Sequence, residues 1–527
     1  MLPSYSSRPG ILRAALAPVV FVVAASASGP VLGQPVLAQT SDDADAVEAT
    51  PDVEPSGDDT DDGVEADASA TDAPSEYGVA PDGLEWTSDG QLRLTPDALF
   101  ERVDQHSLLL AASAAAIDRA EARRLEARYA AYPSFRVRAG LAPAPRITVG
   151  QDEDGNYVVE DDDRTELETF SQVVSVGIRM ESSATIPITT FGQIRLARQL
   201  ADIGIDVAEL EYDKQRREDR FDAWQAHLAL QWWRVIEPLL DEANQRLDEA
   251  EEELDWAIDD GDHDARGTLR ELRIARPELV SLESEARNTA FLARSGLVQG
   301  LALDDAFTVQ RLDDDAGGEP PSLDAVLAFA RDHRPDAALL EAAVDAAELD
   351  RRRRAREYAP EIAFITSLNA AYTPTVTDLT GPFIYDPYNR FGIGFSIGLN
   401  WRINPFVQAA RVRGATAELD RVSALRDAAW AGIALDVERA WRDAESARRL
   451  VLAYEDALRA AEAERNQTAF QYDQGLAEYS DFAEPLKTWY ETAADYWTAV
   501  LQYRIAVARL GLACGADDLT AWPPVGE

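Results

Sequence analysis

Two hydrophobic periodicities alternate along the chain, and each predicts a different kind of element. The clearer one covers residues 391–402, where every odd position is large and apolar and every even position is glycine or polar. A period of two predicts a β-strand with one apolar face and one small, polar face. A related alternation covers residues 174–181, and partner strands are expected at 135–139 and 362–368. Four strands are therefore predicted.

Long helical segments follow these strand pairs, at residues 192–260 and 407–474. At 1.5 Å per residue, each segment is about 100 Å long. Apolar residues recur in the first segment at spacings of three and four, a heptad seam that predicts helix pairing. The seam consists of Leu240, Ala243, Leu247, Ala250, Leu254 and Ala257. Turns are expected at Gly261 and Gly475, so each segment begins an antiparallel helical hairpin.

The chain contains an internal duplication. Residues 96–135 align without a gap to residues 323–362, at a constant offset of 227. In both copies the pattern predicts one helix of about 37 residues that ends before a proline, then two strands and a helical hairpin. The resulting boundaries are a first repeat at 90–303, a linker at 304–317, a second repeat at 318–520 and a tail at 521–527.

The N-terminal region has a different composition. Residues 1–38 contain an apolar run of about 14 residues after Arg8 and Arg13, which favours a secretory signal peptide over the alternative, a membrane anchor. Residues 39–89 are predicted to be a disordered acidic linker, since residues 42–85 contain 16 acidic side chains and no Lys or Arg.

Composition excludes several classes of function. The formal net charge of -45 argues against binding of nucleic acid through basic patches. Cys514 is the single cysteine, so neither a disulfide framework nor a cysteine metal site is expected. No nucleophile elbow, phosphate-binding loop or zinc-protease motif occurs in the sequence, and we predict no enzyme activity, cofactor or metal. A hydrolase with paired carboxylates remains an open alternative in so acidic a chain.

Four amphipathic strands cannot close a barrel, and open sheet edges are unstable in lipid. The strands are therefore expected to cross a membrane together with strands from other copies. The predicted lipid-facing residues are Phe391, Ile393, Phe395, Ile397, Leu399 and Trp401. The predicted lumen-facing residues are Arg136, Arg138, Arg179 and Arg402. The alternative is a soluble four-stranded sheet packed on a helix.

Residues 470–482 and 503–511 resemble the periplasmic hairpin tip and the closing helix of the TolC family of outer-membrane efflux proteins. The resemblance implies a mainly α-helical chain with a transmembrane β portion, which forms a trimeric α/β-barrel in the outer membrane with its helices in the periplasm. It also implies a passive exit duct of an efflux pump or type I secretion system. Its partners would be a periplasmic adaptor (membrane fusion protein), an inner-membrane transporter and outer-membrane lipid. The alternative is a periplasmic coiled-coil scaffold without a pore.

The resemblance also implies the sites. Asp481 and Glu484 match positions that form acidic rings in the family's periplasmic constriction, and Tyr472 matches a tyrosine that holds the tip closed. The alternative is that both acids are ordinary surface residues. The positions opposite Tyr472 are Arg266 and Gly267 rather than a polar and acidic pair, which puts the family's locking network in doubt. The tip residues expected to contact the adaptor are Gly261, Asp262, Gly475 and Leu476.

Overall fold

The computed structural model describes residues 84–86, 92–144, 149–151, 157–159, 175–261, 265–303, 306–314, 318–374, 376, 386, 388–474, 476 and 479–521. The predicted signal peptide and most of the acidic linker lie outside these residues. Within the described ranges, no helix has a stretch that is both long enough and apolar enough to cross a membrane.

The order of elements is the same in both repeats, as predicted: helices, two long strands and a helical hairpin. The first repeat contains α3 (Pro96–His106), α4 (Leu108–Tyr129), β3 (Ser134–Ala144), β6 (Ser175–Thr189), α5 (Gln193–Asp259) and α6 (Ala265–Leu301). The second contains α7 (Leu323–His333), α8 (Pro335–Arg356), β8 (Glu361–Tyr372), β9 (Arg390–Asn400), α9 (Pro405–Asp473) and α10 (Tyr479–Cys514).

Short strands lie outside this pattern. β1 (Leu84–Trp86), β2 (Leu92–Leu94) and β7 (Phe307–Thr308) form one sheet, while β4 (Val149–Gln151) pairs with β5 (Tyr157–Val159). Two of these short strands, β1 and β7, fall within the ranges of the predicted linkers. The end of the acidic linker alternates apolar and acidic residues and pairs as β1, and the linker at 304–317 contains β7 with its buried Phe307.

The single helix predicted at the start of each repeat is wrong, because the structure breaks both copies at aligned positions. Ser107 caps α4, and its hydroxyl oxygen accepts a hydrogen bond of 3.2 Å from the backbone N–H of Leu110. In the second repeat, Pro335 begins α8 and holds Arg334 in an extended conformation. A proline disfavours helical geometry in the residue before it, and a serine favours the cap position. The two breaks are 227 residues apart, the offset of the duplication.

The chain divides into two units, each with its own core. The sheet unit comprises His106–Phe221, Pro320–Asp443 and Val507–Glu527; the hairpin unit comprises Met1–Gln105, Asp222–Glu319 and Ala444–Ala506. The core of the sheet unit contains Val326, Ala330, Val437, Ala440, Leu510 and Cys514. Burial raises the pKa of the Cys514 thiol to about 12, so this cysteine is a packing residue.

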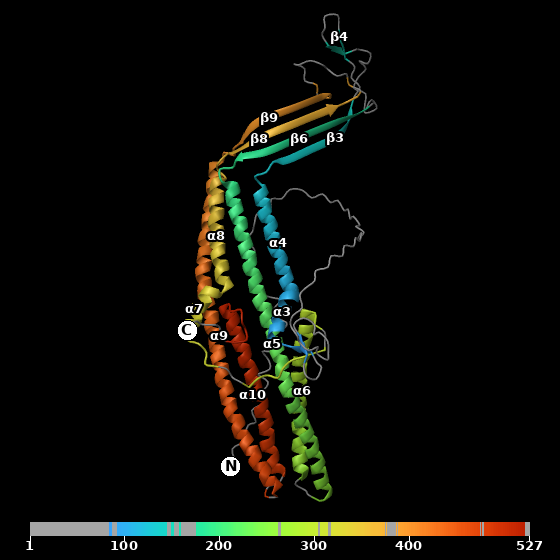
Figure 1. The fold of residues 1–527 in the computed structure, drawn as a ribbon, viewed down its shortest axis with the longest axis vertical. Helices are drawn as coiled ribbons and strands as arrows, with labels where there is room; N and C mark the ends of the chain where they lie inside the picture. Colours follow the sequence, from blue (N-terminus) through green and yellow to red (C-terminus); the bar gives the residue numbers. More distant parts are fainter. Residues whose placement is uncertain are drawn as a thin grey trace, which may run out of the picture. The chain divides into compact units, whose positions relative to one another are not determined.

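The sheet unit contains a four-stranded antiparallel sheet in the order β3-β6-β8-β9 (Figure 1). The pairing of β6 with β8 joins the two repeats. Opposite residues in an antiparallel pair project to the same side. Phe135 lies opposite Ala184, which lies opposite Thr366, and Thr366 lies opposite Phe395. The register therefore collects the apolar alternation of separate strands on one face.

In the hairpin unit, α5 pairs with α6 and α9 with α10 (Figure 1). Helix α5 has 67 residues and α9 has 69, close to the predicted lengths. The predicted seam is the covered face of α5, because Leu240, Ala250 and Leu254 are buried. Gly261 follows α5 with φ +102°, a left-handed conformation that favours glycine and reverses the chain as predicted.

Candidate functional site

The described residues of the chain leave the apolar face of β9 exposed. Side chains at its odd positions are between 59% and 73% exposed: Phe391, Ile393, Phe395, Ile397 and Leu399. Trp401, predicted to continue this face, lies beyond the end of the strand, where its Nε1 donates a hydrogen bond of 3.0 Å to the carbonyl oxygen of Tyr358. Large apolar patches on a protein surface mark contacts with membranes or other proteins.

The opposite face of the sheet is polar. Arg136 lies opposite Ser183, Arg138 lies opposite Glu181, and Arg179 lies opposite Gly140. These three arginines therefore share one face of β3 and β6. Arg402, which was grouped with them in the prediction, lies in the connection after β9 rather than in the sheet. An apolar face opposite a charged face fits a sheet between lipid and water.

At the other candidate site, a hydrogen bond joins the two hairpins of one chain near their tips. The hydroxyl of Tyr472, on α9, donates to Oε1 of Glu253, on α5, at 2.6 Å. Arg266 and Gly267, which were expected opposite Tyr472, lie on α6 and take no part in this bond. Sequence reasoning missed Glu253 because nothing in the sequence distinguishes it from the surrounding acids of α5.

The remaining tip residues are only partly described. Asp481 and Glu484 both lie on α10, three residues apart, and Glu484 is exposed. Leu476 is 78% exposed, as a contact residue for a partner would be. Asp262 and Gly475 lie outside the described residues, as does the side chain of Asp481. Their roles stay predictions.

Helix α10 carries further acids that sequence reasoning missed. Burial raises the pKa of Glu491 above its ordinary value; Lys487, 3.7 Å away, opposes this rise, and the charges of Glu278 and Glu484 add to it. One turn further along α10, burial also raises the pKa of Asp495. Glu491 and Asp495 are seven and eleven residues from Glu484, a spacing that could have indicated a shared helix face.

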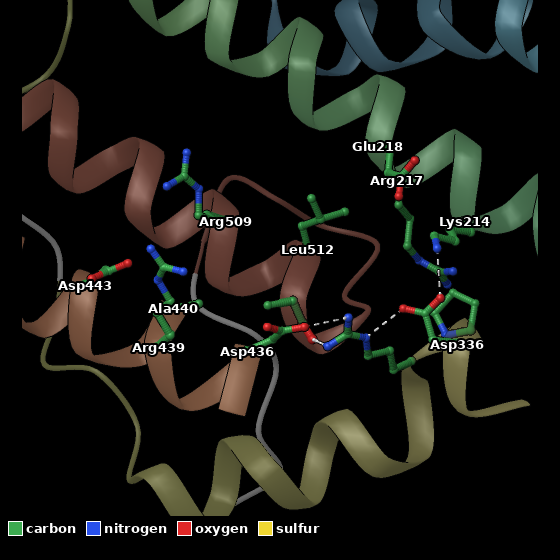
Figure 2. A pocket seen from close by; sticks show the side chains of 13 residues that line it. Lys214, Arg217, Glu218, Asp336, Asp436, Arg439, Ala440, Asp443, Arg509 and Leu512 are labelled. Atoms are coloured by element: carbon green, nitrogen blue, oxygen red, sulfur yellow. Dashed lines mark hydrogen bonds and ion pairs between the residues drawn. The ribbon is translucent and has the colours of Figure 1, made fainter. Parts of the chain in front are cut away.

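A charged cavity of about 440 Å³ lies within the sheet unit (Figure 2). Asp336, in the first turn of α8, contacts Nζ of Lys214 and Nε of Arg334, each at 3.0 Å. Burial alone would raise the pKa of Asp336, but the two cations outweigh burial and lower it. Burial raises the pKa of Glu218 on the same wall. Lys214 belongs to the first repeat and Asp336 to the second, so this ion pair joins the two repeats.

No group of histidine, cysteine and acidic side chains in the described part of the chain has the arrangement of a metal site. The two candidate sites therefore offer a surface for lipid and an acidic, hydrogen-bonded helical tip.

Comparisons with known proteins rest on structure alone. No family model matches the sequence, and no curated protein matches it. Among solved structures, the CmeC outer membrane channel of Campylobacter jejuni aligns with a TM-score of 0.61 at 13% identity, over 80% of this chain and 85% of that one. The open state of the MtrE outer membrane channel of Neisseria gonorrhoeae aligns with a TM-score of 0.60 at 14% identity, over 80% of this chain and 89% of that one.

This chain has the fold of an outer-membrane channel. The outer membrane protein VceC of Vibrio cholerae gives the same result, with a TM-score of 0.57 at 14% identity over 80% of this chain and 96% of that one. The channel fold confirms the predicted mainly α-helical class, with two tandem repeats of helices, strands and a long helical hairpin.

Proposed function

We propose that three copies of this chain form a passive channel in the outer membrane, the exit duct of an efflux pump or type I secretion system. The observation that carries the proposal is the uncovered apolar face of the four-stranded sheet, opposite a face that bears arginines. Strands β3 and β9 have no partner on their outer edges among the described residues. Three such sheets, joined edge to edge, make a closed wall of twelve strands.

A channel of this kind contributes no catalysis, so a periplasmic adaptor and an inner-membrane transporter supply the energy and the cargo. The exposed Leu476 and the turn at Gly261 are the proposed adaptor contacts. Asp481 and Glu484 from each copy form the proposed constriction. A scaffold without a pore would need the same hairpins, but it would have no use for an apolar sheet face.

The bond between Tyr472 and Glu253 is the proposed latch of the periplasmic end. It ties α9 to α5 in each copy, so that the hairpins resist moving apart. Exposed hydrogen bonds to a carboxylate contribute on the order of 1 kcal/mol, an amount that an adaptor is able to overcome. The latch therefore favours a narrow resting state without locking it.

Purified protein in planar lipid bilayers tests both ideas. We expect the wild type to form channels of low conductance, and Tyr472→Phe to increase the mean conductance several-fold. Glu253→Gln should have a smaller effect in the same direction, and the double variant should not exceed Tyr472→Phe, because both changes act on one bond. Tyr454→Phe is the matched control: Tyr454 also lies on α9 and bonds a carboxylate, that of Asp495 on α10.

If no variant conducts, the channel itself is rejected. If all variants conduct equally, only the latch is rejected. The same apparatus tests the constriction, because three pairs of carboxylates favour cations. Asp481→Asn combined with Glu484→Gln should lower the preference for K⁺ over Cl⁻. An unchanged ratio of permeabilities would show that these two acids are ordinary surface residues.

A further inference from the structure

Exposed aromatic side chains occur at each of the four junctions between the long helices and the sheet. They are Tyr129, at the end of α4, and Tyr132, before β3; Phe191, between β6 and α5; Tyr358, between α8 and β8; and Trp401, after β9, with Phe406 in the first turn of α9. Two pairs contact each other edge to face: Tyr129 with Tyr132, and Tyr358 with Trp401. Tyrosine and tryptophan favour the interface between a bilayer and water. These junctions are therefore suited to the depth of the lipid headgroups.

At three of the same junctions, the end of a helix also carries an exposed arginine that forms no ion pair in the described part of the chain. Arg402, at the fourth junction, lies in the connection between β9 and α9 rather than on a helix. Arg128 is in the last turn of α4, Arg195 is in the first turn of α5, and Arg356 is the last residue of α8. We call these three side chains the arginine collar. The backbones of two of these residues are held by hydrogen bonds from neighbouring side chains. The carbonyl oxygen of Arg128 accepts a hydrogen bond from Nη2 of Arg198 at 2.8 Å, and that of Arg356 accepts one from Nε2 of Gln193 at 3.2 Å.

Neighbouring arginines behave differently. Arg351 and Arg352, one turn earlier on α8, both bond Glu348, and Arg353 bonds Asp350. The charges of these three arginines are therefore paired with carboxylates of the same helix. The collar guanidiniums keep their donors available, in a chain whose acids outnumber its cations by 95 to 50. A carboxylate partner was therefore easy to provide, and its absence in the described structure leaves the collar free for an external anion.

The depth and the chemistry point to the same partner. Each collar residue lies within one turn, about 5 Å, of a helix end that adjoins the sheet. The headgroup region on each side of a bilayer is about 5–8 Å thick. A guanidinium binds a phosphate through two parallel hydrogen bonds, and a phosphate diester in a headgroup presents that geometry.

We propose that the arginine collar binds the phosphates of anionic phospholipids in the leaflet that faces the helices. This inference rests on the proposed function, because it places the sheet in a membrane. Binding fixes the depth and orientation of the channel, and it offsets the repulsion between so acidic a chain and a negatively charged membrane surface.

Native mass spectrometry of the purified oligomer, with phosphatidylglycerol and phosphatidylethanolamine in equal amounts, measures this preference directly. We expect the wild type to retain phosphatidylglycerol preferentially, and the triple variant Arg128→Gln, Arg195→Gln, Arg356→Gln to reduce that preference by about five-fold per arginine. Replacement of the three arginines by lysine should restore most of it, since the charge returns without the planar fork.

Arg402→Gln is the matched control for Arg356→Gln. Arg402 is also exposed and follows the paired ends of β8 and β9, but it lies in the connection after β9 rather than at the end of a helix. Arg402→Gln should leave the preference unchanged; an equal loss would overturn the assignment to the collar. An unchanged preference in the triple variant would also overturn it, and so would equally tight binding of soluble glycerophosphoglycerol. Conductance of the same samples in planar bilayers distinguishes failure of the channel from failure of the collar.

Discussion

The apolar side chains of β9 are exposed, whereas those of the hairpin seam are buried or half-buried, within one chain. Phe395, in the middle of β9, is 70% exposed, whereas Leu254, near the end of α5, is 6% exposed. Both belong to regular apolar patterns of the sequence. The hairpin pattern is covered by the chain's own helices, whereas the apolar side chains of β9 are left exposed by the part of the chain that the structure describes.

The difference distinguishes the apolar surface that one copy of the chain buries by itself from the apolar surface that needs another partner. A heptad seam needs only another helix, and α6 supplies Leu269 and Ala265 against Leu254. A strand with one apolar face and one polar face needs an apolar medium on one side and water on the other. The sheet is therefore the part of the chain that needs a membrane, whereas the long helical hairpins cover their apolar seam without one.

The largest expected effect comes from reversing the polarity of the uncovered face. Phe395→Arg places a charge where lipid is proposed, at a cost of about 2–4 kcal/mol per chain for a position near the middle of the membrane. We expect most of this variant to be lost from the outer membrane. Cell fractionation followed by semi-native electrophoresis measures both the amount in the membrane and the amount assembled.

Ser396→Arg is the depth-matched control, because the next residue of the strand faces the other way. It places the same charge beside the polar face and should assemble nearly as well as the wild type. Equal loss in both variants, or equal tolerance of both, would remove the distinction between the two faces and with it the proposed orientation of the sheet.

A smaller effect, on the melting temperature, is expected in the hairpin unit, where a carboxyl group is partly buried. Burial raises the pKa of Glu491, so its ionised form is disfavoured in the fold and the cost grows as pH rises through that pKa. Glu491→Gln should therefore raise the melting temperature at pH 7 by about 1–2 °C. The gain should shrink toward pH 4, where the wild-type side chain is protonated as well.

Glu418→Gln is expected to change the melting temperature in the opposite direction. Hydrogen bonding to Arg421, at 2.6 Å, lowers the pKa of Glu418, so this side chain stabilises the fold above its ordinary pKa and less so in acid. Its replacement should lower the melting temperature slightly at pH 7. Circular dichroism at both pH values follows both variants, and a gain for Glu491→Gln that is independent of pH would show that burial of charge is not its cause.

Regular patterns made most of the fold predictable. The alternation at 391–402 and the glycine at 261 both depend on neighbours close in sequence; the strand is observed over Arg390–Asn400, and the turn is observed at Gly261. The breaks at Ser107 and Pro335 were also encoded locally, but the continuous Ala-rich helical pattern concealed them. Knowing that the residue before a proline avoids helical geometry would have been enough to find the second break.

The site was less predictable because its partners are distant in sequence. Glu253 and Tyr472 are 219 residues apart, and Lys214 and Asp336 belong to different repeats. Each of these acids is one of 95, so composition gives no reason to prefer it. Such pairings follow from how the hairpins and repeats pack, which a single sequence does not reveal.

The smallest expected effect tests how tightly the polar face of the sheet is packed. A Cβ atom at Gly398 would lie 2.8 Å from Cδ1 of Ile365, whereas a Cβ atom at Gly392, on the same face of β9, would meet nothing within 4 Å. Gly398→Ala should cost about 0.5–1 kcal/mol, because Ile365 must leave its preferred rotamer. Gly392→Ala should be neutral or slightly stabilising, since alanine restricts the unfolded chain. The temperature at which the assembled form dissociates in semi-native gels measures both, and a lower value for Gly392→Ala than for Gly398→Ala would contradict the packing described for this face.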